Sequence, residues 1–490
     1  NVSNLAIRTS QEVNGVSRLH GEVSQKMFNE LDPDYNYAES HIGYVTNCVH
    51  FPTWVAREWL DLYTQHFGED FWENQSSHQV WEKIHQVPGT KIMEIRRLLK
   101  KRLLDWVRHT LQEDLTRRGE NPRSTFEIIN SLRDDALVIG FARRFATYKR
   151  ATLLFTNEKR LAEIVNNANR PVVFIFAGTA HPADKAGQEF IRLIHHTTKN
   201  PLFKGKVIFL ENYSMEMAKL LVQGVDIWLN NPTRPKEASG TSGMKAVMNG
   251  VMNFSVLDGW WCEGYRPGAG WALPEKDTFH DAGLQNELDA ETIYNILEND
   301  IVQSYYEQDK EGVSERWVSH IKNTIADIAP DFVMKRMVDD YQSRFYSKLW
   351  QRSQELKKDE YKLAHELVDW KARIRRAWEA IELTELEAPD TFNRSLPLGE
   401  HFKASVTLHI QDLSAEDLGV EVVFYRRQSE TTLELIKAYP LELQKQEGAL
   451  ATFVCDIQPQ KAGVFEYGFR LFPRHPLLAH RQDFGLVRWL

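Results

Sequence analysis

The run Ala136-Leu137-Val138-Ile139-Gly140-Phe141 contains no polar side chain, which is typical of a strand buried on both faces of a sheet. Four similar runs follow it, at about residues 171–178, 207–210, 225–229 and 254–257. Helical patterns separate them, at about residues 149–167, 186–196, 215–223 and directly after 240. Because strands and helices alternate at this spacing, the sequence predicts βαβ units and an α/β domain with a parallel sheet and flanking helices.

The pattern changes on both sides of this region. Amphipathic helices are expected before it, at about residues 55–67 and 90–118, and residues 331–383 after it are strongly helical in pattern. The linker signal Ala388-Pro389-Asp390 comes next, and beyond it apolar residues alternate with polar ones, as in a small β-sandwich. The sequence therefore predicts divisions into residues 1–47, 48–330, 331–388 and 389–490.

The composition is that of an ordinary globular protein, with 42% apolar and 26% charged residues among 490. A net charge of −8 without runs of like charge gives no sign of a nucleic-acid partner, and no apolar stretch predicts a membrane span. The three cysteines lack zinc-ligand spacing, and no signal peptide is evident, so we expect no metal site and a cytoplasmic location.

Ligands of parallel α/β sheets bind beyond the carboxyl ends of the strands. One loop at that edge contains Glu237-Ala238-Ser239-Gly240-Thr241-Ser242-Gly243-Met244-Lys245, which predicts a turn leading into a helix. Its Ser and Thr side chains are expected to accept from amides of the first turn, and such a helix start attracts phosphate. Lys245 would lie about one turn into the helix, near any bound group. A capped helix with a surface lysine explains the same pattern.

A second loop at this edge, Arg143-Arg144-Phe145-Ala146-Thr147-Tyr148-Lys149-Arg150, carries four cations and suits an oxyanion, although solvated surface charge is an equal alternative. Glu237 could accept from sugar hydroxyls or complement the helix dipole. His20, Asn47 and Trp54, when each is taken alone, are more consistent with a structural role than with a ligand-binding one. The aromatic-rich residues 258–265 could stack on sugar rings or belong to the core.

Together these motifs resemble the pyridoxal-phosphate-dependent α-glucan phosphorylases, retaining glycosyltransferases of the GT-B fold with Rossmann-like sheets. The similarity is greatest to the bacterial branch called alpha-glucan family phosphorylase. It rests on motifs in the family's order, namely residues 13–20, 45–47, 143–150, 211–213, 237–245 and 483–489. The resemblance implies phosphorolysis of α-1,4-glucan (glycogen, starch or maltodextrin) by inorganic phosphate to α-glucose 1-phosphate, without nucleic acid or membrane partners. It is compatible with a homo-oligomer.

The resemblance also implies roles for single residues. Lys245 would carry pyridoxal 5'-phosphate as a Schiff base, and the cofactor's phosphate would relay a proton. The cofactor pocket would be formed by Thr241, Ser242, Tyr213, Trp54 and Arg143. The catalytic residues that bind the substrate phosphate would be Arg144 and Lys149. The glucosyl hydroxyls would be contacted by Glu237, Ser239, Gly240, His20 and Asn47.

Three positions depart from the family pattern. Cys48 stands where Gly is usual, Thr179 where Lys is expected, and Ser214 where this branch has Asp. The change at Thr179 would remove one positive charge from the anion site.

The resemblance further implies that residues 1–47 are what remains of an N-terminal GT-B domain, so we expect this chain to be the C-terminal part of a longer protein and, alone, weakly active or inactive. Two other classes stay open. One is a nucleotide-sugar glycosyltransferase of the same fold without pyridoxal phosphate, and the other is a non-catalytic glucan-binding fragment.

Overall fold

The computed structural model describes residues 2–274, 281–390, 396–397, 399–429, 432–460 and 462–490. The chain forms two compact units, which are not continuous in sequence. The parallel-sheet unit comprises Gly15–Gly21 and Tyr44–Tyr341, and the antiparallel-sheet unit comprises Asn1–Asn14, Glu22–Gly43 and Gln342–Leu490. The short strands β1 (Val13–Gly15) and β2 (Ile42–Tyr44) pair where the chain passes from one unit to the other. The predicted divisions at residues 47, 330 and 388 stay predictions.

The parallel-sheet unit is built on six strands in the order β5-β4-β3-β6-β7-β8, and every pairing between them is parallel. The expected α/β class is thereby confirmed. β8 was not expected, because Gly270 begins a run of only four residues. The strands are β3 (Leu137–Ala142), β4 (Val172–Ala177), β5 (Val207–Leu210), β6 (Ile227–Asn230), β7 (Met252–Val256) and β8 (Gly270–Leu273).

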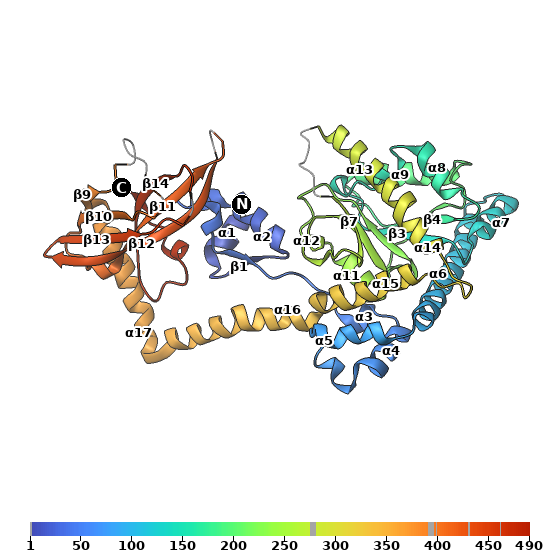
Figure 1. Cartoon of the computed structure of the whole chain (residues 1–490), viewed down its shortest axis with the longest axis horizontal. Helices are drawn as coiled ribbons and strands as arrows, with labels where there is room; N and C mark the ends of the chain where they lie inside the picture. Colours follow the sequence, from blue (N-terminus) through green and yellow to red (C-terminus); the bar gives the residue numbers. More distant parts are fainter. Residues whose placement is uncertain (1, 275–280, 391–395, 398, 430–431, 461) are drawn as a thin grey trace. The chain divides into compact units, whose positions relative to one another are not determined.

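The strand order reverses between β3 and β6. From β3 the chain moves outward through β4 to β5, and it then returns to β6 beside β3 and moves the other way. Since crossovers between parallel strands are right-handed, α8 and α9 lie on one face and α10 and α11 on the other. Figure 1 shows α8 and α9 on the face opposite to α11. Such a reversal leaves a crevice at the carboxyl ends of the two central strands, here β3 and β6.

The helices of this unit surround the sheet. The predicted helix at 149–167 is wrong in extent, because Arg150 has a left-handed backbone (φ 49°) and α8 begins only at Glu158.

No helix in the described parts of the chain is long and apolar enough to cross a lipid bilayer. The helices are α3 (Phe51–Trp54), α4 (Arg57–Phe67), α5 (His78–Trp81), α6 (Gly89–Arg117), α7 (Pro122–Ser131), α8 (Glu158–Val165), α9 (Lys185–Lys199), α10 (Met215–Gly224), α11 (Thr241–Val247), α12 (Trp261–Gly264), α13 (Ala282–Ile296), α14 (Val302–Tyr306), α15 (Glu315–Asn323) and α16 (Met334–Tyr341).

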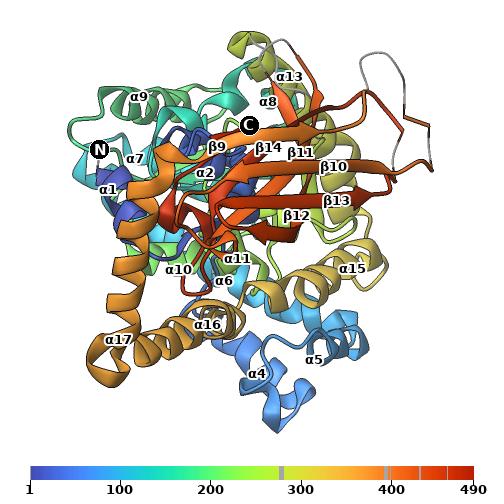
Figure 2. The same cartoon turned by 90° about the vertical axis from the view of Figure 1, so that its left-hand side faces the viewer.

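The antiparallel-sheet unit contains one seven-stranded sheet in the order β15-β14-β11-β12-β13-β10-β9, where two separate sheets were expected. The long strand β12 explains the difference, because its first half pairs with β11 and its second half with β13 (Figure 2). The strands are β9 (Glu382–Glu387), β10 (Phe402–His409), β11 (Leu418–Arg427), β12 (Leu433–Glu447), β13 (Leu450–Ile457), β14 (Glu466–Pro473) and β15 (Arg488–Trp489).

Helices cover this second sheet. α17 (Ser347–Ala377) buries Trp370 and Ile374 in the core of the sheet. The strongly helical pattern expected over 331–383 is realised in part, because residues 358–361 leave helical geometry and residues from Glu382 onward pair as β9. α1 (Val2–Thr9) and most of α2 (Arg18–Met27) also belong to this unit.

Candidate active site

The loops after β3 and β6 bring three charged side chains together. Arg143 Nη2 donates to Glu237 Oε2 at 2.5 Å, and Lys149 Nζ lies 3.8 Å from the same oxygen. All three side chains are at most 11% exposed. Burial, with the Arg143 charge, lowers the pKa of Lys149 to about 8. Two cations facing one carboxylate leave the cluster with surplus positive charge, which an anion would balance.

Several buried polar atoms here have no hydrogen-bond partner among the described residues. They are Nε and Nη1 of Arg143 and the hydroxyl oxygen of Ser239. A buried donor left without a partner costs about 1–3 kcal/mol, and more when charged. Bound oxyanions or sugar hydroxyls would satisfy these atoms.

The four cations of the loop after β3 do not share one function. Arg150 is buried and donates to the carbonyl oxygens of Asn231 (2.8 Å) and Pro232 (2.9 Å), so it fixes the loop after β6. Arg144 is exposed at the same edge and is available to a ligand. The structure thus divides this cationic loop: Arg150 is structural, Arg143 and Lys149 are buried beside Glu237, and Arg144 is exposed.

The predicted turn and helix over residues 237–245 are present. The N-cap of α11 is Gly240, whose backbone is left-handed (φ 83°), and no side chain caps the helix, so the expected capping by Ser and Thr is wrong. Instead Ser242 Oγ accepts from Trp228 Nε1 at 3.0 Å. Thr241 is half-buried at the first position of the helix.

Lys245 lies one turn into α11, with Nζ 3.5 Å from the centre of the Trp54 ring. Burial lowers the pKa of its amine, and no carboxylate in the described parts of the chain forms an ion pair with it. Both effects favour the neutral amine, which is the nucleophilic form. Asn249 fixes this arrangement, because its Nδ2 donates to the carbonyl oxygens of Lys245 (2.9 Å) and Trp54 (3.1 Å).

His20 and Asn47 are joined through the backbone of their segments. Val16 donates its N–H to His20 Nδ1 at 3.1 Å, so the ring proton resides on Nε2, and burial lowers the pKa of the ring. Asn47 donates its N–H to the Val16 carbonyl at 2.9 Å. Ser17 Oγ donates to the Ala238 carbonyl at 2.7 Å, which connects this segment to the loop of Glu237.

Tyr213 lies at the same sheet edge, in the loop between β5 and α10. Its ring packs partly buried against the core of the unit, and burial raises the pKa of its hydroxyl.

The three departures from the family pattern are accommodated by their surroundings. Cys48 Sγ is buried within 3.7 Å of the sulfur atoms of Met334 and Met337. Ser214 caps α10 by accepting from Met217 N–H at 3.1 Å, as an aspartate could do. Thr179 is exposed, and its carbonyl accepts from Phe145 N–H at 2.8 Å.

The aromatic-rich loop after β7 includes Asp258, for which no individual role was predicted. Asp258 accepts from the N–H of Glu237 at 3.0 Å and of Gly259 at 2.8 Å, and burial raises its pKa to about 6. Its position two residues after the buried strand β7 could have revealed it. Trp260 and Trp261 are buried in the core, so the alternative of exposed sugar-stacking rings does not apply to them.

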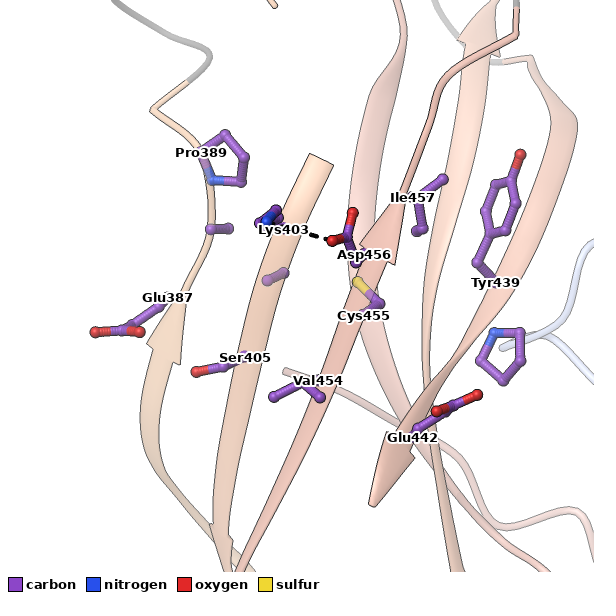
Figure 3. A pocket seen from close by; sticks show the side chains of 13 residues that line it. Glu387, Pro389, Lys403, Ser405, Tyr439, Glu442, Val454, Cys455, Asp456 and Ile457 are labelled. Carbon is purple, nitrogen blue, oxygen red and sulfur yellow. Dashed lines mark ion pairs between the residues drawn. The ribbon is translucent and has the colours of Figure 1, made fainter. Parts of the chain in front are cut away.

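A pocket of about 800 Å³ opens in the antiparallel-sheet unit, between β10, β12 and β13 (Figure 3). Tyr439, Ser405 and Glu442 contribute to its wall. Asp456, also in the wall, forms an ion pair with Lys403 at 3.3 Å. None of the candidate residues above lines this pocket, so it is a separate feature.

Comparison with known proteins finds two family models. Residues 1–264 match the model described as "Carbohydrate phosphorylase", and residues 378–490 match "Glycogen phosphorylase C-terminal domain".

Curated relatives show the same similarity. A maltodextrin phosphorylase of Thermococcus litoralis is 36% identical over 100% of this chain and 57% of its own length. A glycogen phosphorylase of Mycobacterium bovis is 35% identical over 99% of this chain and 56% of its own length. A glycogen phosphorylase of Aquifex aeolicus is 44% identical over 70% of this chain and 49% of its own length. The chain thus spans about half the length of these relatives.

Proposed function

Because the chain belongs to the carbohydrate phosphorylase family, we propose that it contributes the phosphate- and cofactor-binding part of a retaining α-glucan phosphorylase. In this proposal the substrates are an α-1,4-glucan and inorganic phosphate, the cofactor is pyridoxal 5'-phosphate, and the parallel sheet is one half of a GT-B fold. We place the reaction in the cytoplasm, in keeping with the small number of cysteines, three in 490 residues.

The observation that carries this proposal is the cation surplus at the carboxyl ends of β3 and β6. Among the described residues, Arg143 and Lys149 are buried beside the Glu237 carboxylate, and two donors of Arg143 have no hydrogen-bond partner. The half-buried amine of Lys245, which forms no ion pair with any described residue, fits an aldehyde cofactor, and Thr241, Ser242 and Tyr213 would complete its pocket. The residues present therefore suit both a phosphate and pyridoxal phosphate.

When bound there, the cofactor supplies a phosphate group that exchanges a proton with inorganic phosphate. Arg143, Arg144 and Lys149 would hold the inorganic phosphate and offset its charge, so that two phosphates can approach each other. The reaction breaks the bond between the anomeric carbon and the glucan oxygen and forms a bond from that carbon to a phosphate oxygen. The proton lost by phosphate goes to the leaving glucan oxygen.

The sugar would be held by groups on three segments. Glu237 would accept from a glucosyl hydroxyl, and the backbone of Ser239 and Gly240 would donate to others. The bond from Val16 uses Nδ1 of His20, so the Nε2–H of this ring would donate to a hydroxyl of the same sugar. Asn47 would lie beside it. No pair of carboxylates of the glycoside-hydrolase type is required.

The activity itself gives the first test. We expect the intact protein, loaded with pyridoxal phosphate, to release α-glucose 1-phosphate from glycogen only when inorganic phosphate is present. Anomeric configuration is read by NMR, and the sample without phosphate is the control. Glucosyl transfer from a nucleotide sugar by protein free of pyridoxal phosphate would contradict the proposal and favour the nucleotide-sugar class.

The pKa of Lys149 gives a second prediction. Its amine is charged below pH 8 and neutral above it, so phosphate binding should weaken as the pH rises through 8. If only the charged form binds, the KM for phosphate should rise about tenfold between pH 7 and 9. In a Lys149→Arg variant the cation stays charged throughout, and this rise should disappear. Equal pH profiles in the two proteins would contradict the role of Lys149.

A further inference from the structure

Glu263, on the short helix α12, connects two segments that are distant in sequence. Its Oε1 accepts from the N–H of Arg18 at 2.9 Å, and its Oε2 accepts from Thr46 Oγ1 at 2.7 Å. Arg18 is two residues before His20, and Thr46 directly precedes Asn47. A single carboxylate therefore holds the chain next to both candidate sugar-binding residues.

The support beneath Glu263 is rigid. Trp261, the first residue of α12, is fully buried, and its Nε1 donates to the Trp271 carbonyl at 3.1 Å. Gly264 lies so close to Trp260 that a Cβ atom there would meet the indole at 2.6 Å. The carboxylate thus projects from a packed element, and its bonds to N–H and O–H donors are charge-assisted, which makes them about twice as strong as neutral ones.

The segments that Glu263 holds also have other fixation, since Arg336 Nη2 donates to the carbonyl oxygens of Thr46 at 2.7 Å and Asn47 at 3.2 Å. His20 N–H donates to Ser17 Oγ at 3.1 Å, and Asn47 N–H donates to the Val16 carbonyl. These bonds join the segments to each other, and Ser17 bonds to the Ala238 carbonyl. Loss of Glu263 would remove the shared attachment to α12. A displacement of about 1 Å at a reacting site can cost on the order of 10²-fold in rate.

We propose that Glu263 is a positioning residue, which sets the places of His20 and Asn47 against the glucosyl group. The inference rests on the proposed function, because it assumes that these two residues bind sugar. Among the described residues, the carboxylate of Glu263 bonds to the segments of His20 and Asn47 and not to Arg143, Lys149 or Lys245, so we expect phosphate and cofactor binding not to depend on it.

The test compares Glu263→Ala with Glu263→Gln in the intact protein loaded with pyridoxal phosphate. In Glu263→Ala we expect the kcat/KM for glycogen to fall about 30- to 100-fold, and inhibition by D-glucose to weaken in parallel. The KM for inorganic phosphate and the bound pyridoxal phosphate, read by absorbance, should stay within twofold of the parent. Glu263→Gln should retain most of the activity, because its Oε1 accepts from Arg18 N–H while its Nε2 donates to a rotated Thr46 hydroxyl.

A second variant keeps the proposal testable if Glu263→Ala fails to fold. Thr46→Val removes one of the two bonds, and we expect a loss of about three- to tenfold in D-glucose affinity, again without change in the KM for phosphate. Equal losses in the Ala and Gln variants, or a parallel rise in the KM for phosphate, would overturn the positioning role. Failure of the proposed function would look different, because the parent protein itself would then release no glucose 1-phosphate.

Discussion

Replacement of Lys245 by alanine is expected to lower phosphorolysis by about 10⁴-fold or more, the upper range for loss of a proton-transferring group. The reason is that Lys245 Nζ is the proposed attachment point of the cofactor, whose phosphate would exchange the proton. The helix should survive, because alanine is the best helix former and Lys245 makes no ion pair in the described residues. The measurements are glucose 1-phosphate release and the absorbance of bound pyridoxal phosphate, both of which should be lost.

Lys185, exposed at the first position of α9, provides the matched control. Lys185→Ala removes the same side chain from the same unit and should leave both readouts unchanged. Retention of phosphorolysis in Lys245→Ala, with far-UV circular dichroism equal to the parent, would contradict the cofactor role and favour a glycosyltransferase that does not use pyridoxal phosphate.

Replacement of Arg143 by methionine is expected to lower kcat/KM for phosphate by about 10²- to 10³-fold, the usual effect of removing one preorganised electrostatic contact. The variant loses two donors that have no partner in the described residues, and it leaves the buried Glu237 carboxylate with only the more distant Lys149, 3.8 Å away. Arg143→Lys keeps the charge but not the planar fork, so it should retain more activity than the methionine variant.

The control for Arg143 is Arg123, whose side chain is 88% exposed on α7. Arg123→Met should change neither the KM for phosphate nor the melting temperature. If Arg143→Met raises the KM for phosphate no more than Arg123→Met does, the buried cation cluster is not the phosphate site.

The parallel sheet could be predicted because its strands are buried on both faces. Several strands therefore read as uninterrupted apolar runs, as in Val172–Ala177, and the loops at one edge follow from the parallel order. The meeting of Arg143, Lys149 and Glu237 was foreseeable in outline for the same reason. The distances between these side chains, and the Arg143 donors that have no partner among the described residues, could not be predicted. Both depend on how two loops pack together whose residues Arg143 and Glu237 are 94 positions apart in the sequence.

Other features are set by tertiary contacts that a single sequence does not display. The first part of the expected helix at 149–167 is absent, because the guanidinium of Arg150 bonds to carbonyl oxygens of another loop. This interaction overrides the local helix propensity. Glu263 reaches Arg18 across 245 residues, and no spacing rule marks such a pair. β12 is difficult to recognise from the sequence, because it pairs with strands of both halves of the sheet and many of its residues are exposed, which obscures the alternation of apolar and polar residues.

The attachment of pyridoxal phosphate at Lys245 is the central claim, and borohydride reduction tests it most directly. The intact protein purified with its cofactor is reduced with borohydride, digested, and mapped by mass spectrometry. We predict a peptide that contains Lys245 and is heavier by one reduced pyridoxyl phosphate group, while the peptide of Lys185 stays unmodified. An unmodified Lys245 peptide, with the pyridoxyl group on another lysine or on none, would contradict the account.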